Sequence, residues 1–142
     1  MNPDVYTYQT RVRYAEIDRM GVAYHSRYIE WFEAARTDML REKGLPYNRL
    51  EARGFSLPVI EIHCRYFKSV IYDELVTIHT SVKHVNRLKL HLIYNVYGES
   101  DDILRADGFS LHCFVNRQGK PVRVDRQLVI FIGGNSIPDN FV

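Results

Sequence analysis

One long helical segment followed by a run of strand-like segments is the feature that most limits the possible folds of this chain. From Ser26 to about residue 42, apolar residues recur at helical spacing over more than half of the circumference, and Lys43-Gly44-Leu45-Pro46 ends the pattern. After Gly54 the pattern alternates with period two, which is typical of strands that bury one face. A sheet with one apolar face needs a cover, and this helix is the long element available to provide it.

The expected elements follow the order β-α-β-β-β-β, with Ser26 as a helix cap and a short helical turn at 47–53. Strands are expected at residues 6–14, 55–70, 74–84, 88–97 and 103–115, and residues 122–132 could supply one more. Short connections at 69–73, 84–87, 98–102 and 116–120 predict hairpins.

The sequence therefore predicts one α+β domain over residues 1–142, with a core at about 6–132 and a loose C-terminal tail. Its long central helix is expected to be wrapped by a curved antiparallel sheet, which is the hotdog fold. The unpaired edges and the uncovered back of such a sheet favour dimerisation.

Composition limits the kind of partner and the compartment. A net charge of +2 is too small to indicate nucleic acid or an acidic membrane surface as a partner. No apolar run approaches the ~20 residues of a membrane span, and the first residues do not have the pattern of a signal peptide. Cys64 and Cys113 lie in separate strand patterns, so we expect two buried, reduced thiols in a cytoplasmic protein.

Asp18 opens the segment that carries the candidate chemistry, Asp18-Arg19-Met20-Gly21-Val22-Ala23-Tyr24-His25-Ser26-Arg27-Tyr28. A carboxylate just before a helix can act on a group held by the first backbone amides of that helix. An Asp in a polar loop can equally be a turn or cap residue, and the residues alone leave both roles open.

Other familiar kinds of site are missing from the sequence. The six His residues form no His-x3-His pair and no cluster with Cys, so we expect no metal site. His79, His91 and His112 are expected to bond within the sheet or at its surface. The chain has neither a Gly-x-Ser-x-Gly nucleophile elbow nor a phosphate-binding glycine loop.

The segment around Asp18 resembles the acyl-CoA thioesterases of the 4-hydroxybenzoyl-CoA thioesterase type, especially the Tol-Pal-associated subgroup. The resemblance is carried by Arg11-Val12-Arg13-Tyr14-x3-Asp18-x2-Gly21-x2-Tyr24-His25-x2-Tyr28-x3-Phe32-Glu33-x-Ala35-Arg36. Weaker matches follow in Leu57-Pro58-Val59-Ile60-Glu61, Arg65-Tyr66-x-Lys68-x3-Tyr72-Asp73-Glu74-Leu75, Ala106-x-Gly108 and Asn116-x2-Gly119-Lys120-Pro121. Together they cover about residues 6–125.

The resemblance implies that Asp18 is the catalytic carboxylate, acting either as the nucleophile or as the base that activates water. Backbone amides after Gly21, near Tyr24 and His25, are the expected oxyanion donors, and Gly21 would permit the tight turn. His25 either assists proton transfer and orients the substrate or bonds locally at the helix start.

The rest of the implied site concerns substrate binding. Tyr14 and Tyr28 either shape the acyl pocket or pack in the core. Phosphate contacts to coenzyme A are expected from Lys83, Arg87 and Lys89, with Arg65 and Lys68 as weaker candidates. These charges could serve the Asp18 of a neighbouring subunit, or they could simply protect an edge strand.

The expected function is hydrolysis of an acyl-CoA thioester to the free acid and coenzyme A, with no cofactor beyond the coenzyme A half of the substrate. A non-catalytic acyl-CoA-binding hotdog module is the alternative, while a hotdog hydratase would need a different acid and His arrangement. We expect a homodimer or homotetramer.

Overall fold

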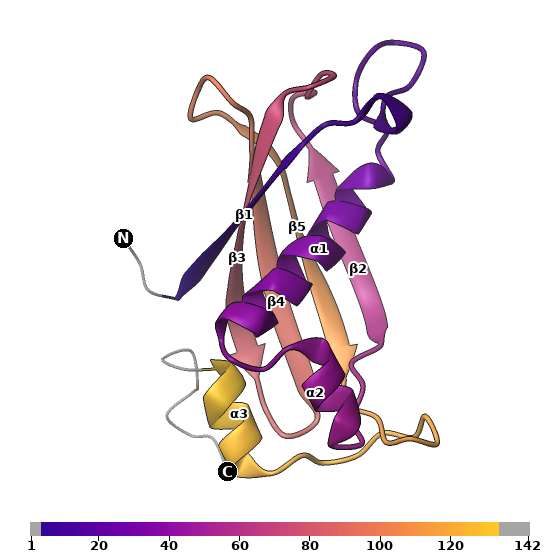
Figure 1. Cartoon of the computed structure of the whole chain (residues 1–142), viewed down its shortest axis with the longest axis vertical. Coiled ribbons are helices and arrows are strands. Elements are labelled where there is room, and N and C mark those ends of the chain that lie inside the picture. The colour runs from indigo at the N-terminus through magenta and orange to yellow at the C-terminus, as the bar shows by residue number, and fades with distance from the viewer. Residues whose placement is uncertain (1–3, 134–142) are drawn as a thin grey trace.

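A five-stranded antiparallel sheet with one long helix across its face forms the body of the protein (Figure 1), and the computed structural model describes residues 4–133. The strands are β1 (Val5–Arg11), β2 (Val59–Tyr66), β3 (Leu75–Val85), β4 (Lys89–Tyr97) and β5 (Leu104–Cys113). The helices are α1 (Arg27–Glu42), α2 (Tyr47–Ala52) and α3 (Arg126–Gly133), with a 3-10 turn η1 at Tyr14–Glu16. The tail expected after residue 133 lies outside the described residues.

Helix α1 buries one face against the sheet and leaves its outer face exposed. The buried side chains recur at helical spacing: Tyr28, Trp31, Phe32, Ala35, Met39 and Leu40. Alternate residues of β3 and β4, such as Ile78 and Leu92, are fully buried in the same core. Burial is therefore confined to one side of the helix, whereas the sequence predicted burial over most of its circumference.

Gly108 allows α1 to lie close to the sheet. The Phe32 ring of α1 stacks on Tyr94 of β4, with ring centroids 4.3 Å apart and planes 7° from parallel. A β-carbon at position 108 would collide with the carbonyl oxygen of His63 and come within 2.7 Å of the Phe32 ring. Any larger residue at this position would displace the helix from the sheet.

Residues 126–133 form α3, so the further strand expected at 122–132 is wrong. Leu128, Val129 and Ile132 are buried while Ile130 is exposed, which is a helical pattern. The Asp125 carboxylate accepts a hydrogen bond from the Leu128 amide at 2.7 Å, as a helix N-cap does. An unbroken apolar run carries no period, and the preceding Asp was the signal that favoured a helix.

Strand β2 pairs with β5 at the edge of the sheet, in the order β1-β3-β4-β5-β2. The hairpin expected at residues 69–73 is therefore wrong, because the chain crosses the end of the sheet from β2 to β3. The hairpins that join β3 to β4 and β4 to β5 are confirmed. Ile60 and Ile62 of β2 are 48% and 40% exposed, so this edge presents apolar surface.

A chain of hydrogen-bonded side chains, called here the buried polar chain, crosses the core beneath α1. Arg36 donates to the Tyr94 hydroxyl at 3.4 Å, and the Tyr94 and Ser110 hydroxyls are 2.6 Å apart. The Ser110 oxygen lies 2.7 Å from Nε2 of His112, whose Nδ1 lies 3.0 Å from the Leu57 carbonyl oxygen. Burial, aided by the Arg36 charge, lowers the pKa of His112 to about 4.

The neutral His112 ring determines the direction of donation along this chain. Because Nδ1–H donates to the Leu57 carbonyl, Nε2 has to accept, so Ser110 donates to His112. Tyr94 then donates to Ser110 and accepts from Arg36. Each of the two hydroxyls therefore has one donor and one acceptor partner, which is how buried polar groups avoid a desolvation penalty.

Candidate active site

Asp18 begins a tight hairpin turn just before α1. Ile17 and Ala23 form an isolated antiparallel bridge, and the Asp18 amide donates to the Val22 carbonyl at 2.9 Å. The Gly21 amide donates to the Asp18 carbonyl at 3.0 Å, and its φ of 80° lies in the left-handed region that favours glycine. The turn expected of Gly21 is thus present; its approach to a substrate stays a prediction.

The Asp18 carboxylate is partly tied to this turn. Its Oδ1 accepts the Met20 amide at 2.8 Å and the Val22 amide at 3.5 Å. Within residues 4–133 no basic side chain pairs with it. The turn role and the chemical role are therefore compatible, because one oxygen holds the turn while the other is available to a reactant.

A pocket of about 310 Å³ opens beside Asp18. Its lining comes from the hairpin, the start of α1 and the end of β2 with its following connection: Asp18, Ala23, Tyr24, His25, Tyr28, Tyr66, Phe67, Lys68 and Ser69. The structure thus brings together Asp18, Tyr24, His25 and Tyr28 with the weaker candidate Lys68, and adds Tyr66, Phe67 and Ser69, which the sequence did not identify as site residues. The motif Arg65-Tyr66-x-Lys68 was the available signal for them.

Aromatic rings form much of the pocket wall. The Tyr28 and Tyr66 rings meet edge to face at 4.9 Å, and the Tyr24 and His25 rings lie 4.3 Å apart. The Tyr66 hydroxyl donates to the His25 carbonyl at 2.7 Å. Burial raises the pKa of Tyr28 to about 12 and also raises the pKa of Tyr66. Both phenols are therefore neutral near pH 7.

The two backbone amides directly before α1, those of His25 and Ser26, are left without a partner among the described residues. The Ala23 amide donates to Val70 and the Tyr24 amide to Glu16, so neither is free. The His25 and Ser26 amides make no hydrogen bond within residues 4–133. Ser26 is the N-cap position as expected, but its side chain makes no capping hydrogen bond.

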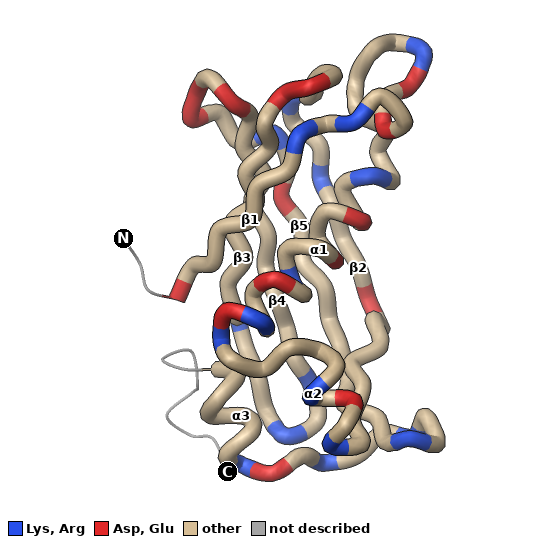
Figure 2. Tube along the Cα trace, in the orientation of Figure 1, with Lys and Arg blue, Asp and Glu red and all other residues tan. Residues whose placement is uncertain are grey.

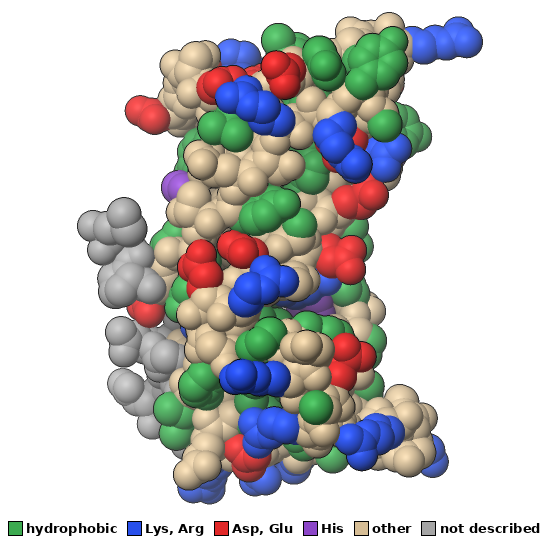
Figure 3. Space-filling model, viewed as in Figure 1, with side chains coloured by type: hydrophobic (Ala, Val, Ile, Leu, Met, Phe, Trp, Pro, Cys, Tyr) green, Lys and Arg blue, Asp and Glu red, His purple; other side chains and the backbone are tan. Residues whose placement is uncertain are grey.

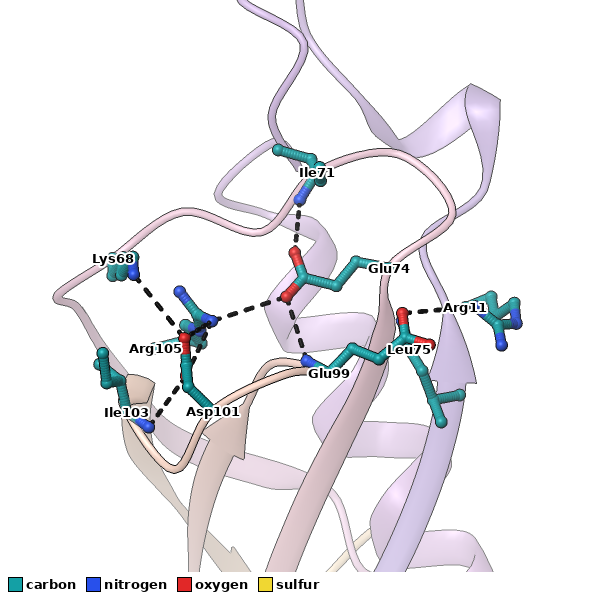
Figure 4. A network of polar contacts seen from close by, with 9 residues as sticks. All are labelled: Arg11, Lys68, Ile71, Glu74, Leu75, Glu99, Asp101, Ile103 and Arg105. Atoms are coloured by element: carbon teal, nitrogen blue, oxygen red, sulfur yellow. Dashed lines mark hydrogen bonds and ion pairs between the residues drawn. The ribbon is translucent and has the colours of Figure 1, made fainter.

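The connection between β2 and β3 is held by a network around the buried Arg105 (Figure 4). Arg105 Nη2 lies 2.9 Å from both carboxylate oxygens of Asp101 and 3.7 Å from Glu74 Oε2. Glu74 Oε1 accepts the Ile71 amide at 3.1 Å, and Ile71 forms a bridge with Val22 of the Asp18 hairpin. This network therefore fixes the β2–β3 connection, which supplies Lys68 and Ser69 to the pocket wall.

Tyr14 is placed outside the pocket. It lies in η1 beyond the end of β1, is 77% exposed and contacts the Tyr72 ring edge to face at 5.8 Å. Hydrophobic side chains gather at the surface of this end of the molecule (Figure 3), with Met20 and Ile71 also exposed. Tyr14 thus belongs to an exposed apolar surface near the site and does not line the pocket.

Lys83, Arg87 and Lys89 lie at the other end of the sheet, around the turn between β3 and β4. Arg87 also donates to the Val124 carbonyl at 2.7 Å. Figures 1 and 2 show the hairpin before α1 at one end and this turn at the opposite end. Within one chain, these cations are not brought to Asp18.

The end that carries Lys83 is strongly basic (Figure 2). The segments 49–53, 83–89 and 114–126 are joined there by the Arg53–Asp125 ion pair at 3.0 Å and the Arg87 bond to Val124. Their basic residues are Arg49, Arg53, Lys83, Arg87, Lys89, Arg117, Lys120, Arg123 and Arg126, and their acidic residues are Glu51 and Asp125. The net charge of the whole chain is small and therefore does not reveal that basic residues are concentrated at this end.

Several further features limit the chemistry of residues 4–133. No group of three His, Cys, Asp or Glu side chains is arranged to hold a metal ion there. Cys64 and Cys113 are free, as expected, but both are half-buried rather than buried. None of the helices in this part of the chain has the length and apolar character needed to cross a bilayer.

This chain is similar to known thioesterases and thioester hydrolases. Residues 12–132 match the model of the thioesterase-like superfamily. The acyl-CoA thioester hydrolase YbgC of Escherichia coli O157:H7 is 24% identical over 129 residues, which cover 91% of this chain and 96% of that protein. The 4-hydroxybenzoyl-CoA thioesterase of Pseudomonas sp. (strain CBS-3) is 25% identical over 125 residues, which cover 82% and 87%. The structure of DHNA-CoA thioesterase from Staphylococcus aureus superposes with a TM-score of 0.81 at 34% identity, covering 86% and 82%.

Proposed function

The chain belongs to the thioesterase-like superfamily and is a thioester hydrolase, and from that premise we propose that it hydrolyses acyl-CoA to the free acid and coenzyme A. The observation that carries the proposal is a single pocket lined both by Asp18, whose carboxylate has no ion-pair partner among the described residues, and by His25, whose backbone amide is free. The motif from Arg11 to Arg36 supports membership of the 4-hydroxybenzoyl-CoA thioesterase type. The Tol-Pal-associated subgroup, the wrapped central helix and a cytoplasmic location stay predictions.

Asp18 has two routes to the same products. As a base, its carboxylate takes a proton from water while the water oxygen adds to the thioester carbon. As a nucleophile, a carboxylate oxygen adds to that carbon and forms a mixed anhydride, which water then hydrolyses. In both routes the C–S bond breaks, the thiolate of coenzyme A leaves and takes up a proton, and the carboxylate must start ionised.

The free amides of His25, which lines the pocket, and of Ser26, the next residue, are the best candidates for the oxyanion donors. The neighbouring amides of Ala23 and Tyr24 already donate to the carbonyls of Val70 and Glu16, so they could serve only if those bonds were broken. Two amides at a helix start provide both N–H groups and the positive end of the helix dipole. The oxyanion donors expected near Tyr24 are therefore assigned in this proposal to the backbone amides of His25 and Ser26.

The side chains of the pocket have separate roles in this proposal. Tyr24, Tyr28 and Tyr66 line the space for the acyl group, and each combines an apolar ring with a hydroxyl group. The His25 imidazole lies on the same wall, within reach of a leaving thiolate that needs a proton. Gly21 keeps the backbone of the turn close to Asp18.

Coenzyme A phosphates fit the basic end of a second subunit. The distance between Asp18 and Lys83 along the sheet means that one chain does not supply both contacts. A homodimer or homotetramer in which the basic end meets another subunit's pocket would supply them, and the apolar β2 edge favours such association. Lys68, which lines the pocket itself, offers a phosphate contact within the same chain.

The decisive experiment measures thiol release from short, long and aromatic acyl-CoA esters by the wild type and by Asp18→Asn. Hydrolysis that collapses in the variant supports the proposal, and the substrate profile describes the acyl pocket. Binding of the esters without hydrolysis by the wild type would favour a non-catalytic acyl-CoA-binding module.

A further inference from the structure

Glu16 is a buried carboxylate to which the proposed reaction gives no chemical role. It is 3% exposed, and its Oε2 accepts the Trp31 indole N–H at 3.0 Å. Its Oε1 accepts the Arg13 amide at 2.8 Å and lies 3.4 Å from the Arg13 guanidinium. Burial raises its pKa, but the hydrogen bonds from Arg13 and Trp31 outweigh burial, so the pKa is lowered and the group is ionised near pH 7.

The same residue forms the base of the Asp18 hairpin. The Tyr24 amide donates to the Glu16 carbonyl at 2.8 Å, directly below the bridge between Ile17 and Ala23. The backbone of Glu16 thus holds both arms of the hairpin, while its side chain bonds to Trp31 inside α1. Glu16 therefore joins the turn that carries Asp18 to the helix whose start carries the free amides.

We propose that Glu16 is a positioning residue: its bond to Trp31 sets the spacing between the Asp18 carboxylate and the first amides of α1. This inference rests on the proposed function, because it assumes that Asp18 and those amides act on one thioester carbonyl. A buried carboxylate is costly to retain unless all its partners are in place, which makes the arrangement rigid. A misplacement of about 1 Å in such a site can lower the rate about 10²-fold.

Two conservative substitutions break this bond from opposite sides. Glu16→Gln keeps the size of the side chain but has one acceptor oxygen, which cannot serve both Trp31 and Arg13. Trp31→Phe keeps an aromatic ring in the core but removes the N–H donor. We expect each variant to lower kcat about 10- to 100-fold while KM changes less than about threefold, since the pocket walls are untouched.

The double variant shows whether the two substitutions act through one shared hydrogen bond or through two independent effects. If both substitutions act through the bond between Glu16 and Trp31, the double variant will have a kcat close to that of the more impaired single variant. Ser110→Ala is the matched control, because it breaks buried hydrogen bonds in the core away from the pocket. It should lower Tm as much as Glu16→Gln and leave kcat unchanged.

Trp31 also provides a readout that does not depend on turnover, because it is the single tryptophan of the chain. Its emission should shift in Glu16→Gln and stay unchanged in Ser110→Ala. Should Glu16→Gln fail to fold, Trp31→Phe alone carries the kinetic test, since it leaves the carboxylate and its Arg13 bonds in place.

Three results would overturn the proposal: single variants within twofold of the wild-type kcat, losses no larger than that of Ser110→Ala, or additive losses in the double variant. Failure of the proposed function looks different. Full turnover by Asp18→Asn would remove Asp18 from the mechanism, and no hydrolysis by the wild type would remove the reaction itself; in both cases the emission shift in Glu16→Gln would remain.

Discussion

The pocket beside Asp18 and the buried polar chain both combine an imidazole with hydroxyl groups. In the buried polar chain, Ser110 Oγ lies 2.7 Å from His112 Nε2, a distance suited to a nucleophile and its base. Both residues are fully buried, and the hydroxyl also accepts from Tyr94. In the pocket, Asp18 touches fewer groups but is open to a reactant.

The difference between these two regions shows that availability, rather than proximity, separates a reactive cluster from a structural one. Each hydroxyl of the buried polar chain is used once as donor and once as acceptor, and its His is a weak base because burial lowers the pKa to about 4. The pocket retains an oxygen of Asp18 and the amide of His25 without partners among the described residues, and the amide of the next residue, Ser26, is free as well. The following substitutions test this contrast.

Asp18→Asn should have the largest effect. Asparagine can still accept the Met20 amide, so the turn and Tm should be preserved, but it is neither a base nor an anionic nucleophile. We expect kcat for an acyl-CoA ester to fall about 10²- to 10⁴-fold, measured by thiol release. Unchanged turnover in a folded variant would show that the available carboxylate of the pocket is not the reactive group.

Ser110→Ala should affect stability and leave turnover intact. It leaves His112 Nε2 and the Tyr94 hydroxyl without their partner in the core. We expect the free energy of unfolding to drop by about 2–3 kcal/mol in denaturant titration, with kcat within twofold of the wild type. A loss of activity with the fold intact would mean that the buried polar chain takes part in the reaction.

Acid should weaken the fold through His112. Its pKa is about 4 when folded and about 6.5 when unfolded, so below pH 6.5 the unfolded chain binds the proton first. Stability from this group is complete above about pH 6.5 and is lost as the pH falls toward 4. Unfolding titrations should show a loss of about 2 kcal/mol between pH 7 and pH 5, and His112→Gln should flatten that slope.

Alanine at Lys83, Arg87 or Lys89 should have the smallest effect. If these cations contact the phosphates of coenzyme A, KM should rise about 3- to 10-fold for acyl-CoA and stay constant for a phosphate-free acyl-pantetheine. Arg41→Ala, on the outer face of α1, is the control. The same rise in Lys68→Ala instead would place the phosphate contact within the chain that carries Asp18.

The sequence alone was sufficient to predict those parts of the molecule that are formed by residues close together in the chain. Helix α1 follows from its own period, and Asp18, Tyr24, His25 and Tyr28 meet in the pocket because a single turn precedes that helix. The other wall comes from β2, about forty residues further along, and its place depends on strand order. Period and turn residues do not specify which strands become neighbours.

One further error and one missed contact have similar causes. The apolar run at 128–132 has no period of its own, so the choice between strand and helix was decided by packing against β3 and by the Asp125 cap. The bond between Glu16 and Trp31 joins residues fifteen positions apart on two elements. Nothing in the spacing of an acid and an indole indicates that they will meet once the chain has folded.

The one-way donation along the buried polar chain has a consequence for solvent exchange. The hydroxyl protons of Tyr94 and Ser110 both point away from water and toward the next acceptor in the core. Hydroxyl protons on a protein surface are lost to the solvent too quickly to be seen individually, but these two lie in buried residues and can exchange only when this part of the core opens. Their lifetimes in a proton NMR spectrum would therefore measure how often the core of this protein opens.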